Sequence, residues 1–318
     1  MNGPSFGNFL RRAEGRISNT WPAASHIQRR VRRGMSFTSL PRAPRQPGSL
    51  WAVGLMKNEE DVARPTIEHL LRQGVAGVIV ADNNSTDGTF AILEGLAQQH
   101  SRVFVGRDHE PAFYQGDKTS WLAELARRAG ADWVLPFDAD ELCFAEGVSL
   151  GEFFRRTDAS VVWAGLHEVL PTVESPRILM GSGLRVQIES QATELPKVIF
   201  RSRGWVWVGE GNHTIRGYKG ERSPVLHTLH YQYRSREHLI EKARRGVAGL
   251  DAAIELSRGV GSHWRGHATL GEEEQDALWR ALLAGTSEDH GGSRLRAPRV
   301  VVSDPTAWRT WDPLGLLR

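Results

Sequence analysis

Trp133–Glu141 reads Trp-Val-Leu-Pro-Phe-Asp-Ala-Asp-Glu, an apolar run that ends in clustered carboxylates. This pattern is typical of a buried strand that delivers polar groups at its end. Two aspartates one residue apart at a strand end suit a hard divalent cation such as Mg²⁺ or Mn²⁺, which binds oxygen ligands together with substrate phosphates. A solvated acidic loop is the alternative, so the motif has to be weighed with its surroundings.

Apolar strands and helical segments alternate through the N-terminal half of the chain. The pattern predicts strands at 50–56, 75–81, 102–107 and 132–137, and helices at 62–73, 89–100 and 118–130. This alternation indicates an α/β fold with a mostly parallel central sheet and helices on both faces. Pro136 has no N–H donor, so we expect a bulge or an early strand end there.

Polar residues follow three of these strands, at Lys57–Asp61, Asp82–Thr89 and Asp138–Glu141. In open α/β sheets, ligands bind beyond the carboxyl ends of the strands. The three clusters are therefore expected to converge on one crevice although they are far apart in the sequence.

The alternation weakens after Leu150, where the chain predicts a mixed α+β half. Strands are expected at 160–170, 184–188, 197–201, 205–209 and 225–233, and helices at 235–257 and 272–284. We therefore divide the chain into a flexible basic segment (1–49), a donor half (50–150), an acceptor half (151–285) and an irregular tail (286–318) anchored by Trp308 and Trp311.

Composition excludes several classes of protein. No apolar run approaches the ~20 residues of a membrane span and no secretory signal is recognisable, so we expect a cytoplasmic protein. A single cysteine, Cys143, excludes an internal disulfide and a cysteine-built zinc site.

The net charge of +3 is unevenly distributed, because residues 1–49 hold nine arginines and one acid, Glu14. A solvated leader and peripheral contact with anionic lipid or a partner both explain this segment. Specific nucleic-acid binding is disfavoured because no recognition motif accompanies the charge.

Three elements of the sequence resemble the family 2 glycosyltransferases of the GT-A fold. They are Lys57-Asn58-Glu59-Glu60, Val80-Ala81-Asp82-Asn83-Asn84-Ser85-Thr86-Asp87-Gly88-Thr89 and Phe137-Asp138-Ala139-Asp140-Glu141. The resemblance covers about Leu50 to Leu142 well and the rest more loosely. It implies a nucleotide-diphospho-sugar donor (a UDP-sugar favoured), a divalent Mn²⁺ or Mg²⁺ ion, and transfer of the sugar to a glycan or lipid-linked acceptor.

Carried over by position, the resemblance assigns Asp82 to the nucleotide base, Glu59 to the base and ribose, Asp138 to the ribose or metal, and Asp140 to the metal. Relatives of this fold often complete the metal site with a C-terminal histidine, for which His213 is preferred over His230. The full set of expected donor-binding residues is Lys57, Glu59, Asp82, Asn84, Asp87, Lys118, Asp138, Ala139 and Arg234.

Simpler alternatives accompany these assignments. Asp82 and Asp87 are also typical of a capped turn before a helix, and Lys118 of a plain surface lysine. Arg234, Arg236 and Lys242 are candidates to screen the diphosphate, but a solvated helix face explains the last two equally well.

An inverting transferase also needs a carboxylate to accept the proton of the acceptor hydroxyl. Among Glu189, Glu194 and Glu210, we favour Glu210 because glycines flank it near His213, with Asp140 as the metal-binding catalytic residue. Trp205 and Trp207 are candidates to stack on an acceptor sugar. A metal-dependent phosphatase that uses the Asp-x-Asp motif and a non-catalytic sugar-binding protein on the same fold are the alternative functions.

Overall fold

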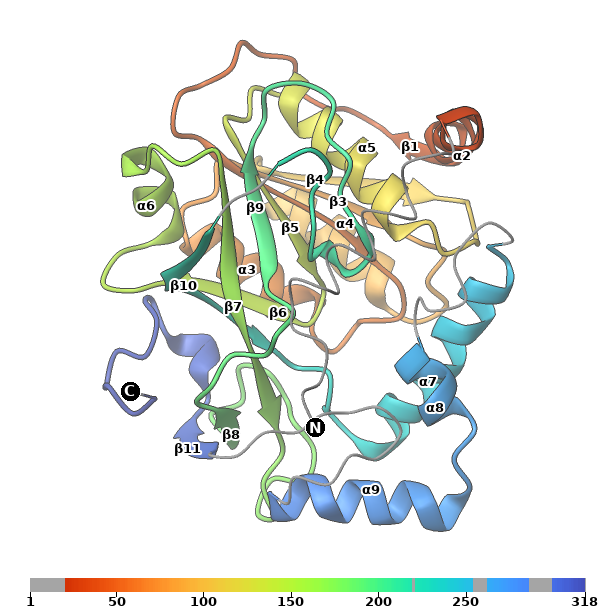
Figure 1. Ribbon diagram of the computed structural model, residues 1–318, viewed down its shortest axis with the longest axis vertical. Helices are drawn as coiled ribbons and strands as arrows, with labels where there is room; N and C mark the ends of the chain where they lie inside the picture. Colours follow the sequence, from red (N-terminus) through yellow and green to blue (C-terminus); the bar gives the residue numbers. More distant parts are fainter. Residues whose placement is uncertain (1–20, 219–220, 254–261, 286–298, 318) are drawn as a thin grey trace.

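The computed structural model describes residues 21–218, 221–253, 262–285 and 299–317. Its centre is a mixed sheet in the order β1-β4-β3-β2-β5-β9-β7-β10-β6, with β8 paired to β7 and β11 paired to β8 (Figure 1). The strands are β1 (Met35–Phe37), β2 (Leu50–Met56), β3 (Gly77–Asp82), β4 (Val103–Asp108), β5 (Trp133–Asp138), β6 (Glu141–Ala145), β7 (Val161–Leu170), β8 (Arg185–Glu189), β9 (Lys197–Arg201), β10 (Glu221–His230) and β11 (Arg299–Ser303).

The sheet has a parallel part and a mixed part. Strands β4, β3, β2 and β5 are parallel neighbours, as the sequence predicts. On the other side of β5, strand β9 is antiparallel to both of its neighbours, β5 and β7. Strand β10 is parallel to β7, and β6 is antiparallel to β10. The α/β fold class with a mixed second half is thereby confirmed.

Helices cover both faces of the parallel part. The covering helices are α2 (Trp21–Gly34), α3 (Ala63–Arg72), α4 (Thr89–Gln99), α5 (Gln115–Arg128) and α6 (Leu150–Arg156). The later helices are α7 (Arg236–Asp251), α8 (Ser262–Ala268) and α9 (Glu272–Ala284). Alternate residues of β2 show the two layers: Leu50 and Ala52 pack with α3, α4 and α6, whereas Trp51 and Val53 pack with α2 and α5. In Figure 1, α7, α8 and α9 gather at the lower right, apart from these layers.

Several sequence expectations about the elements were wrong. Residues 21–37 of the segment expected to be flexible form α2 and β1, and β1 pairs with β4; residues 1–20 lie outside the described residues. Strands β6 and β11 were not expected, and residues 205–209 make only the isolated bridge between Val208 and Ile215. In the tail, Trp308 and Trp311 are buried in the cluster beneath β6, as expected.

Pro136 neither bulges nor ends its strand. The pairing of β5 with β2 runs without a shift from Trp133 to Asp138, with Pro136 opposite Val53. The ladder to β9 covers only Trp133 and Val134, so that edge of β5 is unpaired at the proline. A residue without an N–H donor is tolerated at such a position.

Packing within the parallel sheet yields a stability prediction. A Cβ atom at Gly77 in β3 would lie 2.4 Å from the ring of Trp51, whereas a Cβ atom at Gly95 in α4 would meet nothing within 4 Å. We expect Gly77→Ala to lower the free energy of unfolding by about 1–3 kcal/mol through overpacking. Gly95→Ala, the matched control, should raise it by about 0.5–1 kcal/mol through helix propensity. Urea denaturation measures both, and equal effects of the two substitutions would contradict the packing argument.

Among the described residues, no helix combines the length and the apolar character that a membrane span requires.

Candidate active site

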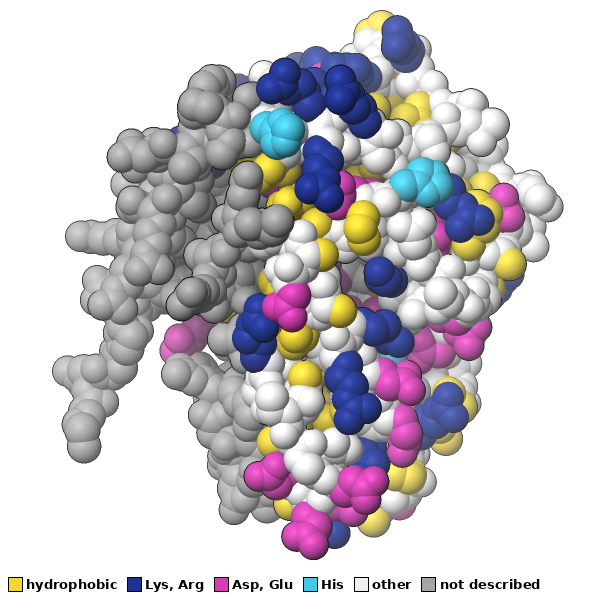
Figure 2. Space-filling view, turned by 90° about the vertical axis from the view of Figure 1, so that its right-hand side faces the viewer, with side chains coloured by type: hydrophobic (Ala, Val, Ile, Leu, Met, Phe, Trp, Pro, Cys, Tyr) yellow, Lys and Arg dark blue, Asp and Glu magenta, His cyan; other side chains and the backbone are white. Residues whose placement is uncertain are grey.

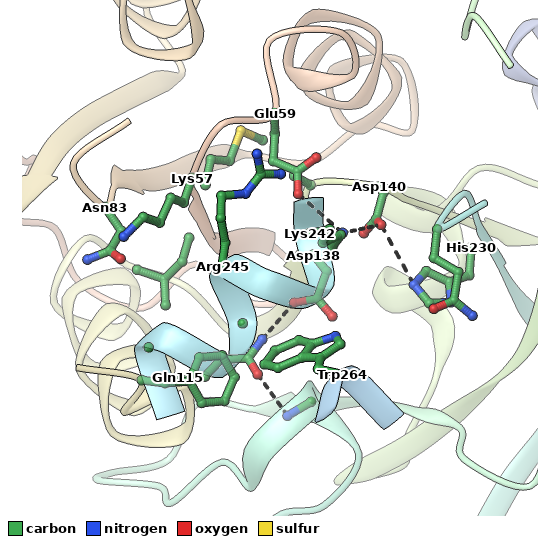
Figure 3. A pocket seen from close by; sticks show the side chains of 18 of the residues that line it. Lys57, Glu59, Asn83, Gln115, Asp138, Asp140, His230, Lys242, Arg245 and Trp264 are labelled. Atoms are coloured by element: carbon green, nitrogen blue, oxygen red, sulfur yellow. Dashed lines mark hydrogen bonds and ion pairs between the residues drawn. The ribbon is translucent and has the colours of Figure 1, made fainter. Parts of the chain in front are cut away.

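A cavity of about 710 Å³ opens where the ends of β2, β5 and β10 meet α5, α7 and α8. Figure 3 shows that side chains from all these elements point into it. The carboxylates among its lining residues are Glu59, Asp138, Asp140, Glu168 and Glu194, and the lysines and arginines are Lys57, Lys118, Lys197, Lys242 and Arg245. The Lys57 and Asp138 clusters therefore converge as predicted, and cations balance the acidic groups.

The register of three strands assembles the floor of this cavity. His230 at the end of β10 is opposite Glu141 of β6 on one side and Glu168 of β7 on the other. Asp140 lies in the turn just before β6, and its carbonyl oxygen accepts a hydrogen bond of 2.8 Å from the Tyr231 N–H. The pairing thus brings His230 beside Asp140 although the two are distant in sequence.

Asp138 is held by neighbours on both carboxylate oxygens. Its Oδ1 accepts hydrogen bonds from Gln115 (2.8 Å) and Asn212 (3.1 Å), and its Oδ2 lies 2.7 Å from Lys197 Nζ. Burial would raise the pKa of Asp138, but Lys197 keeps it below its ordinary value. This side chain is thus a negatively charged group that is already coordinated within the protein.

Lys197 is a buried cation that joins the two ends of the Asp-x-Asp turn. Its ammonium lies 2.6 Å from Glu141 and 2.7 Å from Asp138, and its side chain is only 4% exposed. Burial raises the pKa of Glu141 to about 7 despite this contact. Because Glu141 follows Asp140 directly, Lys197 fixes the backbone that presents Asp140.

Asp140 faces three cationic groups. Its Oδ2 is 2.6 Å from Lys242 Nζ, 3.6 Å from Arg234 Nη1 and 3.8 Å from His230 Nε2. Lys242 also lies 3.2 Å from Glu59, so it bridges two acidic side chains at the cavity wall (Figure 3). Burial would raise the pKa of Asp140, but Lys242, His230 and Arg234 hold it well below its usual value.

His230 is oriented by Glu168, which lies 3.1 Å from Nδ1 and leaves Nε2 directed at Asp140. This carboxylate–histidine arrangement is typical of metal ligands. Burial alone would lower the pKa of His230, but Glu168, Asp140 and Glu141 raise it to about 9, so a metal ion at Nε2 would displace a proton. His213, the preferred ligand from sequence, also lines the cavity; its Nδ1 bonds the Pro196 carbonyl at 3.1 Å, and burial lowers its pKa to about 3.

The donor set fits a divalent ion only in part. Within the described part of the chain, no three His, Cys, Asp or Glu side chains are grouped so that they could hold a metal ion. Asp140 and His230 supply one oxygen and one nitrogen 3.8 Å apart. Such a pair suits an ion whose other positions are filled by substrate phosphates and water.

The Asp82–Thr89 turn lies at the same rim of the sheet but plays a mainly structural part. Asp82 is fully buried and does not line the cavity; its Oδ2 accepts from Arg107 and Ser85, while its Oδ1 has no hydrogen-bond partner among the described residues. Asp87 accepts from both the N–H and the hydroxyl of Thr89 at the start of α4, as the capping alternative predicts. Asn84 is exposed with φ of 54° and is likewise outside the cavity lining.

Four other residues predicted to bind the donor line the cavity, and one, Arg234, does not. Lys57, Glu59, Lys118 and Ala139 line it. Lys118 is no surface lysine, because it is buried and bonds Asp108 at 2.7 Å and the Glu110 carbonyl at 2.6 Å. Burial lowers its pKa.

Arg234 and Glu210 do not line the cavity. Arg234 is 1% exposed and is ion-paired to Glu59, Asp61 and Asp140, so the structure does not support its predicted contact with a diphosphate. Glu210 accepts a hydrogen bond of 3.1 Å from the Gly116 N–H at the start of α5, and burial raises its pKa to about 8. Arg234 and Glu210 are held outside the cavity lining by these ion pairs and this hydrogen bond.

Trp205 and Trp207 also lie away from the cavity. Trp205 packs against Trp121, and the Arg32 guanidinium of α2 lies 4.8 Å from the Trp205 ring. Neither tryptophan lines the cavity, so the structure does not support their stacking on an acceptor there.

Sequence reasoning missed Lys197, Glu168, Arg245 and Trp264. A lysine and a glutamate within the apolar strands β9 and β7 are a usable signal, because a buried charge needs a partner. Arg245 and Trp264 carry no such signal, since their positions depend on how α7 and α8 fold over the cavity.

Comparison with known proteins gives a family match for part of the chain. Residues 55–170 match the model of the family described as glycosyl transferase family 2. No curated protein matches the sequence.

Among solved structures, S. aureus TarS 1–349 is 13% identical with a TM-score of 0.39, covering 74% of this chain and 79% of TarS. The mannosyltransferase PcManGT from Pyrobaculum calidifontis, in complex with GDP-Man and Mn²⁺, is 15% identical with a TM-score of 0.38, covering 75% and 73%. Likenesses of this size say nothing about the substrate of this chain. The family match covers about a third of the chain, from the end of β2 to the end of β7, and includes both acidic strand ends.

Proposed function

We propose that this protein transfers a sugar from a nucleotide-diphospho-sugar, a UDP-sugar favoured, to a glycan or lipid-linked acceptor with the help of Mn²⁺ or Mg²⁺. The observation that supports this most directly is the pairing of Asp140 with His230 at the wall of a cavity built on the family segment. The 710 Å³ volume lies within the ~300–1,000 Å³ range of small-molecule sites.

We assign the donor nucleotide to the side of the cavity formed by Lys57, Glu59, Asn83 and Lys118. These residues follow β2 and β3 or begin α5, where parallel strands end.

The diphosphate would lie between Asp140 and α7. Asp140 and His230 would hold a divalent ion, which would neutralise charge on the leaving diphosphate. Lys242 and Arg245 line the cavity from α7 and present cations to the same region. Asp138, fixed by Lys197, would then face the ribose rather than the metal.

For the acceptor base, Glu194 is better placed than Glu210. Glu194 is exposed and lines the cavity in the segment between β8 and β9, so a bound acceptor hydroxyl could approach it. Glu210 is directed at the Gly116 N–H instead. We therefore replace the sequence-based choice with Glu194.

A donor screen tests the proposed function. Nucleotide sugars with Mn²⁺ should raise the unfolding temperature for the true donor, because a ligand that binds only the folded state stabilises it. Asp140→Asn should abolish the Mn²⁺-dependent part of this shift. Asp276→Asn, on the exposed face of α9, is the control and should keep it. If no nucleotide sugar shifts the wild-type protein with or without Mn²⁺, the proposed function is wrong.

The assignment of Glu194 as the base predicts that two conservative variants differ in kcat. Glu194→Gln should lower kcat by about 10²–10⁴-fold with little change in donor KM, since the amide cannot accept the proton. Glu210→Gln keeps an oxygen that can accept from Gly116 and should leave most of kcat. Steady-state kinetics with the identified donor measure both, and the reverse ranking would restore Glu210 as the base.

We further propose peripheral contact between α2 and anionic membranes. Arg29, Arg30, Arg32 and Arg33 of this helix are exposed, and the helix contains no acidic residue. Figure 2 shows Lys and Arg side chains gathered near the upper end of the face to which α2 contributes.

Arg33→Glu should weaken binding to phosphatidylserine vesicles roughly fivefold or more, from a contribution of about 1 kcal/mol per basic residue. The same change at Arg280, which is exposed on α9, is the matched control. Equal losses in vesicle sedimentation would show nonspecific charge rather than a surface on α2.

A further inference from the structure

We propose that Lys242 is an exchangeable cation, which neutralises Asp140 and Glu59 in the ligand-free protein and moves to the donor diphosphate when nucleotide and divalent metal bind together. This inference rests on the proposed function, because it names how the same site is regulated. Its consequence is that the metal ion binds weakly on its own and strongly in the presence of nucleotide.

The charges around Asp140 support this role. Without Lys242, Arg234 would be the one lysine or arginine among the described residues that is ion-paired with Glu59, Asp61 and Asp140, and negative charge would remain on these three carboxylates. Such a site would attract a divalent ion. With the Lys242 ammonium 2.6 Å from Asp140 and 3.2 Å from Glu59, that attraction is reduced, and the Asp140 oxygen nearest His230 is already occupied.

Arg234, just before α7, and Lys242, within α7, both contact Asp140, and Lys242 is the one able to leave. Arg234 is 1% exposed and is bonded to three carboxylates, so moving it would leave several buried charges unpaired. Lys242 is 25% exposed, lines the cavity, and carries its ammonium on a flexible four-carbon stem. A rotation of that stem could transfer the ammonium from the wall into the cavity.

The cavity side of α7 offers the place to which Lys242 would move. Arg245 is three residues further along α7 and lines the same cavity, as does Gly246. Residues three apart lie on one helical face, so the two cations can approach one anionic group. In Figure 3, Lys242 and Arg245 come from the same helix, with Asp140 beyond Lys242.

The test is Mn²⁺ binding to the full-length protein, measured by electron paramagnetic resonance of the free ion, with and without UDP or GDP. For the wild type we expect at least a tenfold rise in Mn²⁺ affinity when the nucleotide is saturating, within the usual range of coupling between sites. Lys242→Met should raise the nucleotide-free Mn²⁺ affinity about tenfold and shrink the nucleotide effect. Unchanged or weaker nucleotide-free binding in this variant would overturn the proposal.

Two further variants make the result specific. Lys242→Arg keeps a cation and should stay near the wild-type Mn²⁺ affinity, and Lys242→Gln replaces the Met variant if the latter does not fold. Arg245→Met should leave nucleotide-free Mn²⁺ binding unchanged but weaken the nucleotide effect, because Arg245 lines the cavity and no ion pair joins it to Asp140 in the described structure.

The outcomes for this proposal and for the proposed function are distinguishable. If the wild type binds Mn²⁺ but neither nucleotide in any combination, the donor class is wrong, while the nucleotide-free comparison still decides the role of Lys242. If nucleotide and metal bind together but Lys242→Met behaves as wild type without nucleotide, the exchange is wrong and the proposed function stands.

Discussion

The contact between Lys197 and the two carboxylates that flank Asp140 is the interaction on which the site depends. Lys197 comes from β9, Asp138 ends β5 and Glu141 begins β6, so one buried ammonium ties together three strands at the cavity floor. Breaking a buried ion pair by removing one partner leaves an uncompensated charge, at a typical cost of about 3–5 kcal/mol. The geometry of the Asp-x-Asp turn is therefore coupled to the stability of the sheet around it.

This coupling occurs where the two parts of the sheet meet. The parallel strands bring Lys57, Asn83 and Asp138 to one edge, as open α/β sheets do. The mixed part contributes His230, Glu168 and Lys197 through the register of β10, β7 and β9. Neither part alone contains both the acidic turn and its cationic partners, so the site is a property of the join between them.

The sequence was sufficient to predict the parallel part because the information there is local. Buried runs such as 50–56 and 75–81 are followed by helical patterns and turn residues, and the order of elements fixes the topology. Strand β6 was not predicted because Glu141–Ala145 pairs with β10, which is far along the chain. A run of five residues contains no signal that identifies such a partner. Helix α2 was missed because proline and arginine content suggested solvation, whereas Val31 and Gln28 are buried.

The same distinction applies to single residues. Asp140 and Glu59 could be placed from their motifs, but the direction of a side chain depends on partners that the motif does not contain. Arg234 and Lys242 are nearby basic residues of the β10–α7 region, yet Arg234 is enclosed by three carboxylates and Lys242 reaches the cavity. Only the packing of α7 against the loop after β2 separates a structural cation from an available one.

The charge balance of the cavity constrains what it can bind. Five carboxylates and five lysines or arginines line it, apart from its histidines. Adding a lone diphosphate or a lone divalent ion to such a surface leaves a net charge in a partly dehydrated space, which is costly. Adding both together changes the total charge little, and it lets the cations now paired with carboxylates turn to the phosphate oxygens. A balanced wall therefore favours a metal–diphosphate ligand over either component, whereas a purely acidic pocket would favour the metal alone.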